Sequence, residues 1–333
     1  GWVLYNIGDG SHEALQQWMD FSARCEESYE ESVCIYEWER MVKKDLTIGT
    51  LKYYASVDSP EAYRAFKAKQ SEHFVRESLN GSHNDIAKVL KSEYGNEFVC
   101  ASIGNKSWFQ FRGHCWEEIE EGVYLRERIS ADIVTKYIDI GKELFTKLAA
   151  VQDKAEEAMH NARLKQVQKI ISNLKSSPYK NNIMKECMEV FYDRRFKNKL
   201  NKNPYLIGFS NGVYDLKLCK FRDGRPEDFI SKCVPIEYVE YEESDEKVQD
   251  VISFLQKVFP DKSIREYFLD VYSNIFVGGN LQKKVYLWTG EGDNGKSITQ
   301  KFFEKMLGDL AIKFNTQYFT GKKASSGAAN PEL

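Results

Sequence analysis

Apolar residues recur at helix-like intervals along the first 80 residues of the chain. Trp18, Phe21 and Cys25 are spaced to share one side of a helix, with acidic residues around them, which is typical of helices with one apolar face. The segment 48–51 is expected to form a turn that caps the start of a short helix. Pro60 suits the first turn of a further helix, because its missing N–H would have no helical partner there. The pattern therefore predicts a helical N-terminal module.

The pattern then alternates between helix and strand. Residues 85–94 predict a short helix that ends at Gly95, and residues 131–200 place apolar side chains at the spacing of longer helices. Between them, the aromatic run 108–116 is typical of a β-hairpin whose aromatic side chains form a core rather than an exposed stacking platform. Glycines spaced through 207–221 indicate a second, small β region.

Two features divide the chain into three predicted domains. A turn signal stands at 80–82, and an acidic run at 237–250 predicts a solvated linker followed by the start of a helix. We therefore expect a helical module over 1–80, a mixed α/β domain over 81–240 and the start of a further domain over 241–333. The predicted fold class is multidomain, α/β and α+β.

Composition places the chain among ordinary globular proteins. Of its 333 residues, 42% are hydrophobic and 29% are charged, which excludes disordered, collagen-like and coiled-coil classes. No run of about 18 apolar residues occurs, so no membrane span is expected. The net charge of −3 excludes a simple basic coat for nucleic acid. Because the chain opens at Gly1 and stops at Leu333 without a closing element, we expect an internal piece of a longer protein.

Cysteine usage indicates the compartment and argues against a metal site. The chain has seven cysteines, widely spaced and without any C-x-x-C pair, which predicts free, mostly packed thiols in a reducing intracellular compartment. His114 and Cys115 are adjacent and have the chemistry of zinc ligands. No second pair follows at ligand spacing, so the sequence argues against zinc.

The strongest chemical signal is a phosphate-binding loop near the C-terminal end. Residues 290–297 satisfy G-x-x-x-x-G-K-[ST] at every specified position. The apolar run 285–288 before the loop predicts a buried parallel strand, and the apolar positions after it predict a helix closed by Gly308. The candidate nucleotide-binding residues are Gly290, Glu291, Gly292, Asp293, Asn294, Gly295, Lys296 and Ser297.

The residue types of this loop match the chemistry of a nucleoside triphosphate with Mg²⁺. Glycines let backbone N–H groups approach phosphate oxygens, and the following helix directs its positive end toward them. Lys296 is the predicted catalytic residue, which neutralises phosphate charge, and the Ser297 hydroxyl is the predicted Mg²⁺ ligand. No apolar run closed by a carboxylate follows, since 310–312 is closed by Lys313. We therefore expect the chain alone to be incomplete for hydrolysis.

A basic segment is the candidate nucleic-acid contact. Residues 161–202 carry eleven Lys and Arg against three acids, a local net charge of +8, with aromatic residues interleaved. Such a segment attracts phosphates, and aromatic rings stack on bases. The alternative is a solvated basic helix whose aromatic residues lie in the core. The candidate contacts are Lys165, Lys169, Lys175, Arg194, Arg195, Lys197 and Lys199.

Several segments resemble a known family. Residues 203–216 and 221–228 resemble the segment ahead of the helicase in poxvirus D5-type primase-helicases. The loop with Asn294 before Gly295 is similar to that of superfamily 3 helicases, which have an AAA+-like ATPase domain, and 320–333 match the stretch that follows it there. The N-terminal part, with Trp18, Trp38 and 48–51, resembles the helical module after a primase core in large DNA viruses and phages.

This resemblance implies an activity, cofactors and partners. It implies a primase-helicase that uses ATP and Mg²⁺ to unwind DNA as a hexameric ring, at the site of viral replication in a host cell. The Walker B carboxylate, the arginine finger and the pore loops would lie beyond Leu333, and no Asp-x-Asp primase motif is present. Two alternatives stay open: a P-loop ATPase of another class, such as a signalling or packaging ATPase, and a non-catalytic DNA-binding or assembly module.

Overall fold

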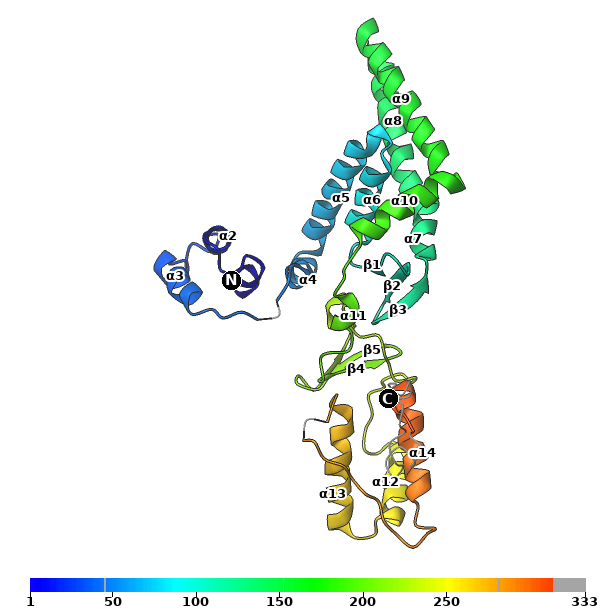
Figure 1. Cartoon of the computed structure of the whole chain (residues 1–333). Coiled ribbons are helices and arrows are strands. Elements are labelled where there is room, and N and C mark those ends of the chain that lie inside the picture. The colour runs from blue at the N-terminus through cyan, green and yellow to red at the C-terminus, as the bar shows by residue number, and fades with distance from the viewer. Residues whose placement is uncertain (45, 152, 281, 314–333) are drawn as a thin grey trace, which may run out of the picture. The chain divides into compact units, whose positions relative to one another are not determined.

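The chain forms two compact units that combine helices with two small sheets (Figure 1). The computed structural model describes residues 1–44, 46–151, 153–280 and 282–313. The first unit comprises 1–110 and 117–197, and the second comprises 111–116 and the described residues from 198 onward. This mixture of helices and small three-stranded sheets confirms the predicted fold class.

Three short helices open the chain: α1 (Trp2–Ile7), α2 (His12–Ser22) and α3 (Glu31–Glu39). Trp38 is buried, stacks on Trp18 with ring centroids 5.8 Å apart, and meets Tyr5 edge-on at 5.1 Å. The Ser11 hydroxyl caps α2 by accepting from the N–H of Ala14. The predicted helical character is confirmed here, and Trp38 forms a small core with Ala14 and Met41.

The next helices begin where local signals place them. They are α4 (Ile48–Asp58), α5 (Pro60–Glu77), the turn η1 (Ser78–Asn80) and α6 (His83–Tyr94). Thr47 caps α4, so residues 48–51 form its first turn rather than a turn ahead of it. Pro60 occupies the first turn of α5, and Gly95 closes α6, as predicted. Both predictions are confirmed. Pro60 acts through its fixed φ, whereas Gly95 ends α6 in the right-handed region, at φ −64° and ψ −17°.

The next elements form a small sheet and a group of long helices, most of them in the first unit; the hairpin turn at 111–116 and the end of α11 from 198 belong to the second unit. The elements are β1 (Phe98–Ser102), β2 (Ser107–Arg112), β3 (Cys115–Glu120), α7 (Val123–Arg128), the π-helix η2 (Ile129–Ile133), α8 (Val134–Ala150), α9 (Lys154–Leu174), α10 (Ser177–Val190) and α11 (Phe196–Lys199). Trp108 of the hairpin is 1% exposed and packs in one core with Phe98, Tyr137 and Leu174. The hairpin and its core role are confirmed.

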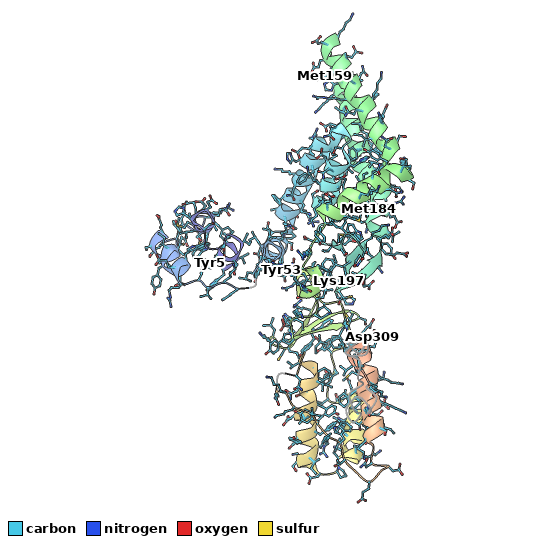
Figure 2. All side chains as sticks on the ribbon, in the orientation of Figure 1. Tyr5, Tyr53, Met159, Met184, Lys197 and Asp309 are labelled. Carbon is cyan, nitrogen blue, oxygen red and sulfur yellow. The ribbon has the colours of Figure 1, made fainter. Side chains whose placement is uncertain are left out.

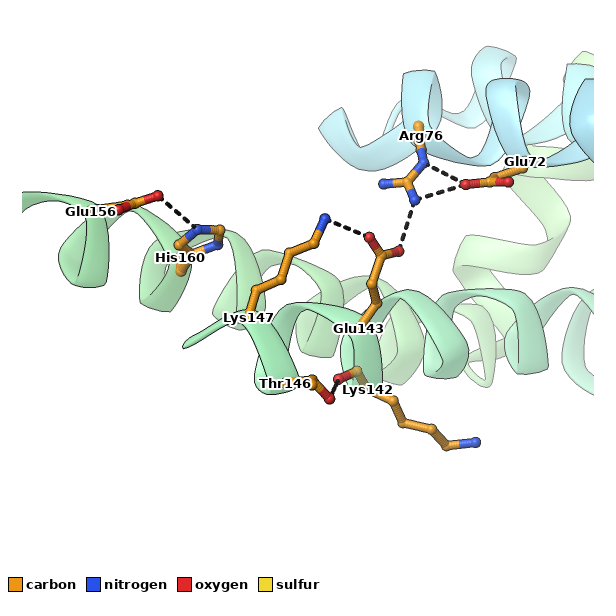
Figure 3. A network of polar contacts seen from close by, with 8 residues as sticks. All are labelled: Glu72, Arg76, Lys142, Glu143, Thr146, Lys147, Glu156 and His160. Atoms are coloured by element: carbon orange, nitrogen blue, oxygen red, sulfur yellow. Dashed lines mark hydrogen bonds and ion pairs between the residues drawn. The ribbon is translucent and has the colours of Figure 1, made fainter. Parts of the chain in front are cut away.

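Helices α8 and α9 pack along each other, as do α5 with α6 and α6 with α10 (Figure 1). Arg76 on α5 donates to Glu143 on α8 at 2.7 Å and to Glu72 at 2.8 Å, and Lys147 donates to Glu143 at 2.6 Å (Figure 3). This network links α5 to α8 at the partly exposed edge of their interface.

The second unit contains a meander and a group of helices. Its elements are β4 (Leu206–Phe209), β5 (Gly212–Asp215), β6 (Lys220–Arg222), η3 (Pro226–Asp228), α12 (Glu246–Val258), α13 (Lys262–Ser273), η4 (Asn274–Phe276), α14 (Lys296–Leu307) and η5 (Gly308–Leu310). The strands pair antiparallel in the order β4-β5-β6, which confirms the small β region. The acidic run is a linker up to Glu246, where α12 begins, as predicted.

A largely buried ion pair and an aromatic cluster stabilise the two parts of this unit. Both Nη groups of Arg222 donate hydrogen bonds to the Asp228 carboxylate, each at 2.8 Å, and these two side chains are largely buried. Among the helices, the Phe268 ring stacks against Phe259 and Tyr272, both at 4.3 Å. Burial in this aromatic cluster raises the pKa of Tyr272 to about 12.

Candidate nucleotide-binding loop and nucleic-acid interface

The loop over 290–297 has the backbone geometry that glycine permits. Gly292 has φ 109°, Asp293 has φ 45° and Gly295 has φ 82°, so three of four consecutive residues leave the usual right-handed region. The chain turns through them directly into α14, with Gly295 as its N-cap. The helix that the motif predicts after the loop is therefore present as α14, and its N-terminal end lies at the loop.

Lys296 folds back over this loop. Its ammonium donates to the side-chain oxygen of Asn294 at 2.7 Å. A Cβ at Gly290 would meet the Asn294 amide and would lie 2.7 Å from the Lys296 Nζ. Gly290, Asn294 and Lys296 are thus brought together at the loop. Glycine at 290 leaves the space that the flexible ends of these two side chains occupy.

Two contacts anchor the start of α14. Thr299 is fully buried, and its hydroxyl donates to the Gly295 carbonyl at 2.9 Å. A Cβ at Gly295 would lie 2.7 Å from Cγ2 of Val258, so α12 packs directly against the loop. Ser297 is exposed at the first turn of α14.

The predicted buried strand at 285–288 is wrong for the described residues. This segment has no strand assignment, and Val285 and Leu287 are 84% and 85% exposed. A parallel strand needs neighbours on its edges and cover on its faces, and no other strand pairs with it in the described part of the chain. Trp288 instead packs on Tyr272, with ring centroids 5.2 Å apart.

The apolar face predicted for α14 is only partly covered. Phe303 packs on Tyr272 with ring centroids 4.6 Å apart, whereas Ile298 is 62% exposed and Phe302 is 42% exposed. These two side chains have the character of buried residues and lack cover from the described residues. The resembling stretch 320–333, including Lys322 and Lys323, lies outside the described residues.

An ion pair closes the turn around Gly224. Arg222 pairs with Asp228 rather than with Asp223 or Glu227. The helical turn η3 carries Asp228 back toward β6, and its carboxylate also accepts from the Arg225 N–H at 2.8 Å. Arg222 is therefore used inside the fold and is not a nucleic-acid candidate.

The basic segment is exposed but divided between elements. Lys165 and Lys169 lie on α9, and Lys175 follows its last turn; Arg194 and Arg195 precede α11, which carries Lys197 and Lys199. Lys197, labelled in Figure 2, pairs with Glu118 at 3.1 Å. The seven candidate residues therefore lie on separate elements rather than on one basic helix.

The aromatic residues of this segment divide in the same way. Phe196 is 1% exposed and packs on Phe109, and Tyr179 donates to the Gly81 carbonyl at 2.8 Å. Tyr192 is 44% exposed. Two of the three aromatics are thus engaged in the fold, and Tyr192 is the one available to stack on a base.

A lysine pocket in the first unit was not predicted from the sequence. It is a cavity of about 420 Å³ whose polar lining consists of Lys52, Lys67, Gln70, Lys88, Lys91, Ser92 and Asn96. Lys67 donates to the Ser92 carbonyl at 2.5 Å, and the Lys91 ammonium lies 4.7 Å from the Phe191 ring centroid. Burial lowers the pKa of both Lys67 and Lys91, and the charge of Lys52 lowers both further.

This lysine pocket suits an anionic group such as a phosphate. The ammonium groups that line a concave site repel each other, and a bound anion offsets that repulsion. The sequence carried a weak signal in the three-residue spacing of Lys88 and Lys91 on α6. The lysines that α4 and α5 contribute to the pocket come close to α6 only when the helices pack. Acidic residues near them in the sequence offset their charge, so no local excess of positive charge is visible there.

Comparison with known proteins adds to this geometry. A family model described as D5 N terminal like matches residues 87–260, and one described as primase C terminal 2 (PriCT-2) matches residues 1–55. The chain is 38% identical over 335 residues to a "Putative helicase" of Acanthamoeba polyphaga mimivirus, covering 100% of this chain and 34% of that protein. None of the helices in the described ranges is long and apolar enough to cross a membrane.

Other viral proteins show the same partial coverage. A "Putative helicase" of Frog virus 3 is 28% identical over 425 residues, which cover 100% of this chain and 43% of that protein. A "Putative primase" of African swine fever virus is 24% identical over 364 residues, which cover 98% and 37%. The chain thus spans between a third and a half of the length of these relatives.

Proposed function

This chain belongs to the D5 N-terminal-like family, and on that premise we propose that it is the central part of a primase-helicase for viral DNA replication. Its relatives carry both helicase and primase names, which supports a role in replication. The order along the chain supports the same proposal: the PriCT-2 region comes first, the D5 N-terminal-like region follows, and the phosphate-binding loop comes last.

We propose that the loop over 290–297 binds ATP with Mg²⁺. The observation that carries this proposal is the left-handed backbone at Gly292, Asp293 and Gly295 leading into α14, a conformation that points backbone N–H groups toward a phosphate. The Lys296 ammonium, folded over the loop beside Asn294, supplies positive charge at the phosphates. The exposed Ser297 hydroxyl is placed to ligate Mg²⁺.

We propose DNA as the polymeric partner. The lysines of α9 and the basic residues around α11 supply exposed positive charge, and the lysine pocket supplies a concave site for a backbone phosphate. A hexameric ring is proposed from the resemblance to superfamily 3 helicases. Location at a viral replication site, in a reducing compartment, is proposed from the same resemblance and from seven free cysteines.

The test is ATP hydrolysis by the longer protein of which this chain is a part, measured with and without single-stranded DNA. Stimulation of hydrolysis by DNA supports a translocating helicase. Hydrolysis that is indifferent to DNA favours the alternative of a P-loop ATPase of another class. Absence of hydrolysis, together with salt-dependent DNA binding by the chain, favours a non-catalytic DNA-binding or assembly module.

A further inference from the structure

Three potential metal ligands meet in the second unit. His114 and Cys115 lie at the turn of the hairpin between β2 and β3, and Cys233 lies in the segment after η3. The ligand atoms of these three residues, one imidazole nitrogen and two thiol sulfurs, all lie within 4.8 Å of one another. Folding thus supplies the additional ligand whose absence at local spacing argued against zinc in the sequence.

Backbone hydrogen bonds hold the two cysteines in place. Next to Cys115, the N–H of Trp116 donates to the Ile230 carbonyl at 2.7 Å. Next to Cys233, the N–H of Val234 donates to the Gly208 carbonyl at 2.8 Å. Both cysteines are therefore flanked by residues that pair with another segment, and the sulfurs approach each other without any movement of the strands.

Two glycines make room for the cluster. A Cβ at Gly224 would lie 2.7 Å from the His114 carbonyl oxygen, so the chain passes directly over this histidine. A Cβ at Gly208 would lie 2.6 Å from the Cys233 sulfur. His114 is half-buried, Cys115 is buried and Cys233 is half-buried. The site is thus enclosed on several sides and still reachable by a small ion.

We propose that His114, Cys115 and Cys233 bind one Zn²⁺ ion, with water as the fourth ligand. Imidazole and thiolate are the ligands that zinc prefers, and tetrahedral bonds of about 2.0–2.3 Å place ligand atoms roughly 3.5–3.8 Å apart. Side-chain rotations bring atoms that lie within 4.8 Å to that separation. The ion joins the hairpin turn to the segment that pairs with β4.

Apolar packing alone explains less of this arrangement. Cys115 and Cys233 do contact Val213 and Ile230, and a buried cysteine behaves as a small apolar residue. That explanation leaves out the imidazole of His114 beside the two sulfurs. A nitrogen donor with two sulfurs is the composition of a zinc site and not of an apolar core.

The test is the zinc content of the 333-residue chain, purified under reducing conditions and measured by plasma mass spectrometry. We expect about one equivalent of zinc in the wild type and a loss of most of it in His114→Ala, Cys115→Ser and Cys233→Ser. The matched control is Cys219→Ser, which changes an exposed cysteine of the same unit and keeps the zinc. Circular dichroism establishes that each variant is folded.

A second measurement does not depend on variants. Replacement of zinc by Co²⁺ in the wild-type chain is expected to produce the absorption of a cobalt–thiolate bond, and a chelator is expected to abolish it. A wild-type chain without bound metal overturns the proposal, as does zinc that all three variants retain. A cross-linked peptide joining Cys115 to Cys233 after purification also overturns it, because it identifies a disulfide in place of the metal.

Discussion

The Lys296 ammonium lies 2.7 Å from the side-chain oxygen of Asn294, within the same loop. The contact holds a long, flexible side chain over the loop rather than extended into solvent. A cation that is already positioned loses less entropy when phosphate binds. Asn294 therefore acts on the proposed chemistry by positioning Lys296.

Lys296→Ala is expected to reduce ATP turnover of the longer protein by at least about 100-fold, because it removes the charge at the phosphates. Asn294→Ala is expected to cause a smaller loss, about 10-fold, because the charge remains and only its position is released. Lys301→Ala, an exposed lysine further along α14, is the control. Steady-state hydrolysis measures all three, and equal turnover in Lys296→Ala and the control contradicts the assignment.

Gly295→Ala is expected to destabilise the loop and to abolish nucleotide binding. The residue has φ 82°, and an added Cβ would lie 2.7 Å from Val258. The left-handed conformation alone costs about 1–2 kcal/mol for alanine, and the clash adds to that cost. Gly104→Ala is the matched control, because an added Cβ there meets nothing within 4 Å. Thermal unfolding and binding of a fluorescent ATP analogue distinguish the two variants.

The double variant Lys165→Glu with Lys169→Glu is expected to weaken binding of single-stranded DNA. The slope of log K against log salt is negative, and each lost phosphate contact reduces its magnitude by about 0.7. Loss of both contacts is therefore expected to reduce the magnitude by about 1.4. The double variant Lys247→Glu with Lys262→Glu makes the same change of charge at exposed lysines of α12 and α13. If both double variants change the slope equally, general charge explains the binding and α9 has no special role.

Lys91→Gln is expected to stabilise the chain and to weaken its binding of phosphate. Burial lowers the pKa of Lys91, so folding opposes its charged form, and this destabilisation is present below the folded-state pKa. Wild-type stability should therefore rise with pH above that pKa, toward the ordinary value of about 10.4. Removing the charge near neutral pH is expected to raise the melting temperature by about 2 °C.

Lys69→Gln is the control for this effect, because Lys69 is exposed on α5 and does not line the lysine pocket. Inorganic phosphate and oligothymidylate are the probes, measured by calorimetry. A Lys91→Gln variant that is less stable, with unchanged affinity for both probes, shows that this lysine is structural.

Glu143→Gln is expected to lose stability in a pH-dependent manner. The hydrogen bond from Lys147, and then that from Arg76, lower the pKa of Glu143 (Figure 3). A lowered pKa contributes stability above the ordinary value of about 4.3, which is lost as pH falls through the folded-state value. The carboxylate is partly exposed, so the loss at pH 7 is expected to be about 0.5 kcal/mol.

Urea unfolding at pH 7 and near pH 3 measures this effect, and the difference from wild type is expected to vanish at the lower pH. Glu120→Gln, at an exposed position of β3, is the control. A difference that persists unchanged at low pH attributes the effect to packing rather than to ionisation.

Local chemistry explains which sequence predictions are confirmed. Pro60 begins α5 because its ring restricts its own backbone. The turn at 292–295 and α14 follow from a compact motif whose residues are neighbours along the chain. The hairpin at 107–120 follows from strand-forming residues on both sides of a short turn.

Predictions that depend on distant partners were less reliable. The strand at 285–288 is absent because a parallel strand forms only beside other strands, however apolar its residues are. The lysine pocket was missed because α4, α5 and α6 each contribute to it. Arg222 meets Asp228 because η3 turns the chain back toward β6.

By itself, the sequence determined the helical character of the N-terminal part, the small β regions, the helix that follows the loop at 290–297 and the family, because these depend on residues close together along the chain. Only the tertiary structure decided that Lys296 folds back onto Asn294, that four lysines share one pocket, and that Cys233 joins His114 and Cys115. Cys233 lies more than a hundred residues after Cys115. Backbone pairing between distant segments brings their side chains together, and no local pattern of residues records that pairing.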